Sequence, residues 1–283
     1  MLRCGPFQLS LARPLIMGIV NVTPDSFSDG GRFCDPARAI EHARRLVEEG
    51  ADILDIGGES SRPGAATVSI DQELTRVLPV LEGLRGIGVP ISVDTVKPEV
   101  MRAAIGAGAA VINDISALSA PGALEAIATS DVAVCLMHMQ GEPRSMQTDP
   151  SYGDVVAEVQ DYLLGRMNTV LAAGIAKERL ILDPGFGFGK NLQHNLALLR
   201  ALPQFTRLGP PLLIGWSRKS SLGTITGRPA QERMPASLAA ALLCAQRGAK
   251  ILRVHDVAAT RDVVAVWEAV EAPTDRSPQE NRQ

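Results

Sequence analysis

Eight short apolar runs, each ending at a polar or charged residue or at a glycine turn, are the dominant pattern along this chain. The runs cover residues 15–20, 53–56, 91–93, 109–112, 132–137, 180–182, 212–214 and 251–254, the last one interrupted by Arg253. Short runs of this kind, rich in Val, Ile and Leu, are typical of strands that are buried on both faces. The pattern predicts eight buried strands with polar groups at their carboxyl ends.

Amphipathic stretches separate these runs and carry helix-capping residues. Asp35 and Pro36 suit the N-cap and first position of a helix, and Gly50 follows its apolar positions. Further helical periodicity covers residues 72–84, 98–105, 123–129, 155–171, 192–201, 234–246 and 259–270. Eight strand–helix units in 283 residues favour a single (β/α)8 TIM barrel over an open doubly wound sheet. No GxGxxG motif opens the first helix, which further disfavours the open sheet.

Composition is consistent with one large catalytic domain, predicted over residues 1–271 and followed by a polar, disordered tail at 272–283. The net charge of -3 and the lack of a long basic block argue against nucleic acid or a membrane surface as a partner. The four cysteines have no metal-ligand spacing, which fits a reducing cytoplasm. Residues 14–20 lack a cleavage pattern and are predicted to form a strand, not a signal peptide.

The polar residues at the strand ends form the candidate site, because the carboxyl ends of barrel strands meet at one mouth. The side chains expected there are those of Asn21, Asp94, Asn113, Asp183, Lys219, Arg253 and His255. Arg253 and His255 should face one cavity while Val254 points away, since side chains alternate along a strand. Each residue alone could cap a helix or pair locally, but their joint placement favours a site.

These groups suit a planar heterocycle beside an anion. Asp94 and Asp183 can accept N–H groups, Asn113 can donate and accept, and a guanidinium such as that of Arg253 can stack on a ring. A phosphate-bearing group with its Mg²⁺ ion would suit the other side, formed by Asn21, Arg62 and His255.

Eight ordered motifs resemble the bacterial dihydropteroate synthases, a family of (β/α)8 enzymes of folate biosynthesis. The motifs are residues 17–31 (MGIVNVTPDSFSDGG), 55–65 (DIGGESSRPGA), 92–95 (SVDT), 113–115 (NDI), 136–141 (LMHMQG), 183–190 (DPGFGFGK), 217–220 (SRKS) and 253–257 (RVHDV). Because the matches extend along nearly the whole chain, the resemblance is specific.

The resemblance implies a transferase that condenses 6-hydroxymethyl-7,8-dihydropterin diphosphate with 4-aminobenzoate, giving 7,8-dihydropteroate and pyrophosphate. It implies pterin contacts from Asp94, Asn113, Asp183, Lys219 and Arg253, all but Asn113 being catalytic. The implied diphosphate contacts are Asn21, Arg62, Arg253 and His255, with Asn21 also contacting Mg²⁺. The implied aminobenzoate side comprises Ser61, Pro63, Phe188, Lys219 and Ser220. A homodimer, associated through helices near the C-terminal part, is also expected.

Three residues depart from the pattern of the family. Ser61 stands where Thr is common, and Trp216 and Ser221 flank the SRKS motif where a less bulky and a more apolar residue are expected. These departures bear on the affinity for the second substrate and on inhibitor sensitivity. Residues 22–33 and 59–67 are long connections at the mouth and are predicted to act as lids.

Two motifs invite other interpretations. The glycines of residues 183–190 do not have Walker spacing, so a nucleotide P-loop is not predicted. Met137, His138 and Met139 suggest a metal site, but one His between two thioethers is more often a strand end.

Three alternative functions remain open from the residues. A pterin-dependent methyltransferase would share Asp94, Asn113 and Asp183 but would have little use for Arg62 and His255; methyl transfer to a corrinoid partner would identify it. An aldolase-type barrel would use an amine such as Lys219 for a Schiff base, which borohydride trapping would detect. A noncatalytic pterin-binding paralogue should have lost lid or anion-site residues, which are present here.

Overall fold

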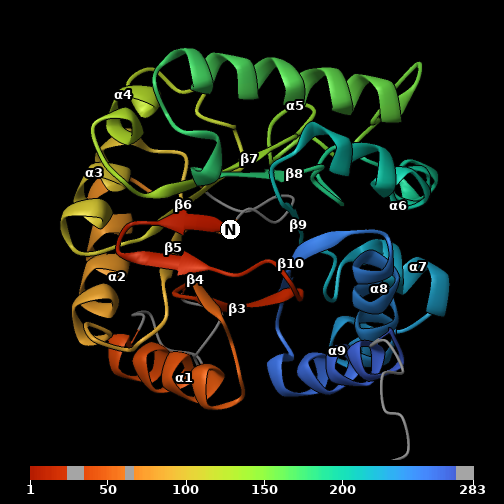
Figure 1. Cartoon of the computed structure of the whole chain (residues 1–283), viewed down its shortest axis with the longest axis horizontal. Coiled ribbons are helices and arrows are strands. Elements are labelled where there is room, and N and C mark those ends of the chain that lie inside the picture. Colours follow the sequence, from red (N-terminus) through yellow and green to blue (C-terminus); the bar gives the residue numbers. More distant parts are fainter. Residues whose placement is uncertain (24–34, 61–66, 272–283) are drawn as a thin grey trace, which may run out of the picture.

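Eight parallel strands close into a barrel in the order β10-β3-β4-β5-β6-β7-β8-β9, which confirms the predicted fold (Figure 1). The computed structural model describes residues 1–23, 35–60 and 67–271. The barrel strands are β3 (Leu15–Asn21), β4 (Ile53–Gly57), β5 (Ile91–Asp94), β6 (Val111–Asp114), β7 (Ala133–Met137), β8 (Leu180–Asp183), β9 (Leu212–Ile214) and β10 (Ala249–Val254). Residues 272–283, predicted to be a tail, lie outside the described residues.

Helices surround the barrel and follow the strands along the chain (Figure 1). They are α1 (Pro36–Glu48), α2 (Ile70–Gly83), α3 (Pro98–Gly106), α4 (Ala123–Ala128), α5 (Val155–Ala172), α6 (Leu192–Phe205), α7 (Ser220–Thr226), α8 (Met234–Gln246) and α9 (Val257–Glu271), with short 3-10 turns at Lys177–Arg179, Thr206–Leu208 and Ala230–Glu232. The predicted cap is present: the Asp35 carboxylate accepts a hydrogen bond from the amide of Ala37 at 2.9 Å, just before Pro36.

Two elements were not predicted from the pattern. Helix α7 has seven residues, with Gly223 and several Ser and Thr residues that weaken a helical signal. A hairpin of β1 (Leu2–Cys4) and β2 (Phe7–Leu9) precedes the barrel, and its strands have three residues each, too few for periodicity to show.

The hairpin closes the end of the barrel where the strands begin. Leu2 and Cys4 are fully buried and belong to one apolar cluster with residues that line the barrel interior, among them Leu15 and Ile53 at strand starts. A second, larger cluster fills the space between the strands and the helices. Among the described residues, no helix is long and apolar enough to span a membrane. With one end sealed by apolar side chains, the opposite end is the one available for polar chemistry.

Candidate active site

A cavity of about 620 Å³ opens at the carboxyl ends of the strands. Most of the predicted site residues line it, namely Asn21, Asp94, Phe188, Lys219, Ser220, Arg253 and His255. Asn113 and Asp183 are 4% and 5% exposed and belong to the buried polar residues beneath this wall. Arg253 and His255 face the cavity while Val254 is buried in the outer core, as the alternation predicts. Ser61, Arg62 and Pro63 lie outside the described residues, as do residues 24–34.

Strand register explains why residues far apart in sequence meet here. Asn21 pairs with Gly57, Gly57 with Asp94, and Asp94 with Asn113, so one level of the barrel carries three polar side chains. Paired residues of neighbouring parallel strands point to the same side of a sheet. Two residues earlier on β4, Asp55 occupies the next inward level, in register with Ser92. The mouth is therefore a stack of polar levels above the apolar floor.

Arg253, in the cavity wall, lies between two carboxylates. Its Nε donates to Asp55 Oδ2 at 2.6 Å, and its Nη2 donates to Asp94 Oδ2 at 3.0 Å. Burial raises the pKa of Asp94 to about 7; Arg253 opposes this rise, and the charge on Asp55 adds to it. For Arg253, burial lowers the pKa, but the two carboxylates outweigh burial and raise it. Asp55 was absent from the predicted site, although a charged residue within an apolar strand was the available signal.

Lys219 reaches the cavity from the N-terminus of α7 and contacts the loop after β8. Its Nζ donates to the carbonyl of Phe186 and lies 4.4 Å from the centre of the Phe188 ring. Burial lowers the pKa of Lys219 to about 8, against the attraction of Asp183. Gly187, at φ 79°, permits this approach, because a Cβ there would lie 3.0 Å from Lys219 Cδ. Burial likewise raises the pKa of Asp183, which Lys219 opposes.

Lys190 and His138 brace the same loop from beneath. Lys190 is 2% exposed; its Nζ lies 2.9 Å from His138 Nδ1 and donates to the Phe188 carbonyl at 2.9 Å. Burial lowers the pKa of Lys190 to about 7, and burial together with the charge of Lys190 lowers that of His138 to about 3. His138 is thus a neutral partner of Lys190 that helps to fix the position of Phe188.

The turn after β9 presents a second set of polar groups. Ser217 Oγ lies 3.0 Å from His255 Nδ1, and the Arg218 guanidinium pairs with Asp256. Arg218 adopts a left-handed backbone at φ 57°, which is uncommon for a residue with a side chain and costs conformational energy. Its amide donates to Ser237 Oγ at 2.9 Å. This braced turn sets the spacing between Lys219 and His255.

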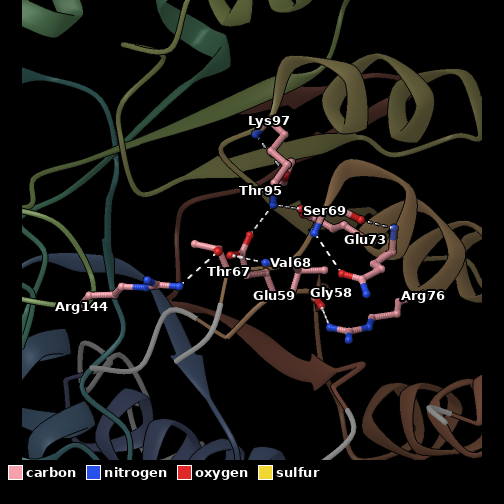
Figure 2. A network of polar contacts seen from close by, with 11 residues as sticks. Gly58, Glu59, Thr67, Val68, Ser69, Glu73, Arg76, Thr95, Lys97 and Arg144 are labelled. Atoms are coloured by element: carbon pink, nitrogen blue, oxygen red, sulfur yellow. Dashed lines mark hydrogen bonds and ion pairs between the residues drawn. The ribbon is translucent and has the colours of Figure 1, made fainter. Parts of the chain in front are cut away.

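Glu59 forms part of the cavity wall and belongs to a separate charged cluster (Figure 2). Lys97 forms ion pairs with Glu59 and Glu73, and Glu73 is fully buried. The other Glu59 oxygen accepts from the amide of Val68 at 3.1 Å. Burial lowers the pKa of Lys97, but the two carboxylates outweigh this and raise it. The cluster fixes the end of β4 against α2.

Trp216 and Ser221, the unusual residues beside the SRKS motif, are partners of each other. Trp216 Nε1 donates to Ser221 Oγ at 2.7 Å, and both side chains are buried. The Trp216 ring also packs on Phe186, with ring centres 5.0 Å apart. Neither residue is among those that line the cavity, so each departure compensates for the other within the core.

The chain matches a family of known proteins over most of its length. A family model described as pterin binding enzyme matches residues 17–255. A curated dihydropteroate synthase from Neisseria meningitidis serogroup B is 54% identical over 275 residues, covering 95% of this chain and 96% of that protein.

Solved structures give the same result. The Xanthomonas albilineans dihydropteroate synthase with 4-aminobenzoic acid superposes with a TM-score of 0.89 and is 56% identical, covering 93% of this chain and 95% of that chain. The Burkholderia cenocepacia dihydropteroate synthase complexed with 7,8-dihydropteroate superposes with a TM-score of 0.87 and is 50% identical, covering 96% of each chain.

Proposed function

This chain belongs to the dihydropteroate synthases of the pterin-binding enzyme family, and we propose that its strand-end cluster of Asp94, Asp183, Lys219 and Arg253 performs the reaction of that family. The reaction condenses 6-hydroxymethyl-7,8-dihydropterin diphosphate with 4-aminobenzoate and gives 7,8-dihydropteroate and pyrophosphate. The observation that carries the proposal is the Arg253 guanidinium held between Asp55 and Asp94 at the cavity mouth. It places fixed positive and negative groups where a heterocycle with a diphosphate arm needs both.

The pterin ring would occupy the inner part of the cavity, beside Asp94, Asn113 and Asp183. A carboxylate accepts N–H donors, and the Oδ1 atom of Asn113 is buried with no partner among the described residues. Burial holds the two aspartates in a medium where a bond to a ligand N–H is strong. The planar guanidinium of Arg253 and the ammonium group of Lys219 would complete this side of the pocket.

Chemistry begins when the bond between the pterin methylene carbon and the diphosphate oxygen weakens. Charge then grows negative on the diphosphate and positive on the pterin. Arg253 and His255, with Arg62 and Asn21, would hold the departing diphosphate, while Asp94 and Asp183 stabilise the cationic ring. The aryl amine nitrogen then forms a bond to the methylene carbon and afterwards loses a proton. A neutral aryl amine needs no strong base before it attacks, so no base is assigned.

A Mg²⁺ ion fits the donors on the diphosphate side. Gly57 leaves the amide oxygen of Asn21 accessible, since a Cβ at Gly57 would lie 3.9 Å from it, and Asn21 lines the cavity beside His255. The described residues contain no group of three His, Cys, Asp or Glu side chains placed to hold a metal. One amide oxygen suits Mg²⁺, which takes few protein ligands when phosphate oxygens and waters supply the rest. Bound there, the ion would neutralise charge on the diphosphate.

The aminobenzoate would lie nearer the solvent, against Phe188, Lys219 and Ser220, with Ser61 and Pro63 from outside the described residues. Lys219 and Lys190 fix the Phe188 region from both sides. An aromatic wall with an ammonium group above it suits a ring that bears a carboxylate.

A homodimer through α8 is part of the proposal. Leu243, 38% exposed, lies four residues after the exposed Ala239 and thus on the same outer face of α8, while the inner face packs on the barrel. Exposed apolar side chains of this kind on one helix are typical of subunit interfaces. Light scattering coupled to size exclusion should give twice the monomer mass, and Leu243→Glu should reduce it. We also propose a cytoplasmic location, which fits the buried free thiols of Cys4, Cys135 and Cys244.

The decisive experiment follows pyrophosphate release and dihydropteroate mass with the purified protein, Mg²⁺ and dihydropterin diphosphate, with and without 4-aminobenzoate. We expect dihydropteroate only when both substrates are present. Lys219→Ala and Asp94→Asn should lower its formation by about a hundredfold or more. Pterin binding without product would instead favour a noncatalytic pterin-binding protein.

A further inference from the structure

We propose that Asp55 is a positioning residue for pterin recognition, with one of its carboxylate oxygens orienting both the Asn113 amide and the Arg253 guanidinium. The inference deepens the proposed function and rests on it for the identity of the ligand. Asp55 is absent from the residues that line the cavity and is fully buried, so it would act through its two partners.

The position of Asp55 in the barrel makes it a support beneath the site. Asp55 lies two positions before Gly57 on β4. Gly57 belongs to the level of the barrel that carries Asn21, Asp94 and Asn113. Successive inward side chains on a strand are two residues apart. Asp55 therefore points into the barrel directly below the level at which the pterin contacts are expected.

A single atom of Asp55 makes both contacts. Oδ2 accepts from Arg253 Nε at 2.6 Å and from Asn113 Nδ2 at 3.3 Å. The first is a charge-assisted bond, which is stronger and shorter than a neutral one. Oδ1 is buried with no hydrogen-bond partner among the described residues. One oxygen of Asp55 therefore joins the Asn113 amide on β6 to the Arg253 guanidinium on β10.

The contact with Asn113 decides which end of that amide meets a ligand. Because the Asp55 carboxylate accepts only, it selects the NH₂ end of Asn113 and leaves the Oδ1 end for the ligand. Oδ1 of Asn113 is buried and has no partner among the described residues. The ligand edge at this point must therefore present an N–H donor. Without the negative charge of Asp55, the amide could rotate by half a turn and present a donor instead.

The contact with Arg253 fixes the plane of the guanidinium. Asp55 holds the Nε edge and Asp94 holds Nη2, so two bonds from different strands define one orientation. A planar fork held at two points loses little further freedom when a ring or a phosphate binds. Asp55 thus links the Asn113 amide, which would select the edge of the pterin ring, to the Arg253 guanidinium, which would lie between the ring and the diphosphate.

The experiment compares Asp55→Ala and Asp55→Asn with Asp114→Asn. Asp114 is the matched control: it is fully buried and follows Asn113 on β6, but its oxygens accept from the backbone amides of Ser116 and Leu118 at 2.7 and 2.8 Å. The measurements are the thermal midpoint, KM for each substrate, and calorimetric binding of dihydropterin diphosphate without 4-aminobenzoate.

We expect Asp55→Ala to weaken pterin binding and raise the pterin KM by about tenfold or more, with the aminobenzoate KM nearly unchanged. Asp55→Asn can still accept through one oxygen and should recover part of this loss. Asp114→Asn should lower the thermal midpoint without a selective change in pterin binding. Pterin affinity within about twofold of wild type in both Asp55 variants, or equal increases in both KM values, would overturn the assignment.

A double-mutant cycle keeps the test valid if Asp55→Ala does not fold. Asp55→Asn is combined with Asn113→Ala, and pterin binding is measured for all four proteins. If Asp55 acts through Asn113, its loss should have a smaller effect once the Asn113 amide is gone. Strict additivity would refute that route. Calorimetry does not require turnover, so failure of wild type to make dihydropteroate would reject the proposed function while leaving the Asp55 test readable.

Discussion

Two cations in this molecule each bridge two carboxylates, yet the two clusters differ in how they meet the cavity. Lys97 lies between Glu59 and Glu73, and Glu59 also accepts a hydrogen bond from the backbone amide of Val68 (Figure 2). Arg253, between Asp55 and Asp94, faces a cavity, and buried acceptors on Asp55 and Asn113 have no partner among the described residues. Glu73 Oε1 is likewise buried without a partner among the described residues, but neither Lys97 nor Glu73 lines the cavity, whereas Arg253 and Asp94 both do. We call the Lys97 cluster, which joins β4 to α2, the closed cluster, and the Arg253 cluster, which a ligand can reach, the open cluster.

The comparison teaches that ion pairing alone does not identify a site. Both cations have raised pKa values for the same reason, two nearby carboxylates that outweigh burial. In the open cluster, burial raises the pKa of Asp94 to about 7 although Arg253 opposes the rise, so a further hydrogen-bond donor would stabilise the charge of Asp94. A ligand with N–H groups would supply that donor.

Breaking the open cluster should have the largest effect. Arg253→Met removes the cation beside the proposed diphosphate site and leaves the buried Asp55 and the partly exposed Asp94 without it. We expect kcat/KM for the pterin substrate to fall by about a thousandfold. Steady-state kinetics with both substrates would measure it, with circular dichroism as the control for folding. A loss below tenfold in a folded protein would contradict a central role for this cluster.

Breaking the closed cluster should affect stability instead. Lys97→Met leaves Glu73 buried without its cation, and we expect a loss of about 2 to 3 kcal/mol in the free energy of unfolding, less than for a fully buried pair because Lys97 and Glu59 are partly exposed. Urea denaturation would measure it. The pterin KM should change by less than about threefold. A selective loss of pterin binding would erase the distinction between the two clusters.

The pH dependence of Asp94 sharpens the comparison. Its folded pKa of about 7 lies above the ordinary value of 3.8, so the folded state binds more protons than the unfolded state between these pH values. The contribution of Asp94 to stability therefore decreases as pH rises. The unfolding free energy of wild type relative to Asp94→Asn should therefore fall by about 2 kcal/mol between pH 5 and pH 7. Denaturation at several pH values would measure this. Parallel curves for the two proteins would rule it out.

The same titration should appear in catalysis. If ionised Asp94 accepts the pterin N–H, kcat/KM for the pterin should fall as pH drops through about 7. A pH profile would show this acidic limb. Its midpoint should move to lower pH when Glu73 is replaced by Gln, because the charge of Glu73 adds to the rise of the Asp94 pKa.

The smallest effect is expected at the Trp216 and Ser221 pair, which lies in the core outside both clusters. Ser221→Ala leaves the indole N–H buried without its acceptor, and we expect a loss of about 1 kcal/mol in stability. The aminobenzoate KM should remain that of wild type. Thermal denaturation and kinetics together would measure both, and Trp216→Phe in the Ser221→Ala background should restore part of the stability. An altered KM would assign this pair to the substrate site.

Most of the fold could be predicted from the sequence because parallel barrel strands are apolar throughout and end abruptly. Strand β9 has the predicted bounds, and β6 begins two residues later than predicted. The hairpin and α7 could not be predicted, since elements of three and seven residues depend on the surface that they cover. Tertiary contacts form these elements more than local preference does.

The candidate site was predictable where polar residues end strands. Asp94, Arg253 and His255 meet at the mouth as alternation and register require. Asp55 and Lys190 were not predicted as site residues, because their roles depend on side chains from distant strands and loops. Sequence spacing gives the direction of a side chain but not which of two carboxylates holds a cation.

The position of the β1–β2 hairpin constrains the order in which the barrel can fold. Residues 2–9 emerge from the ribosome before any barrel strand, yet β1 packs beside β7 and the turn at Lys177–Arg179, and its apolar cluster includes Ile251. Contacts between residues so distant in sequence form late in folding. During synthesis the hairpin therefore lacks its partners, and Leu2 stays exposed, until β7 and the Lys177–Arg179 turn have been made.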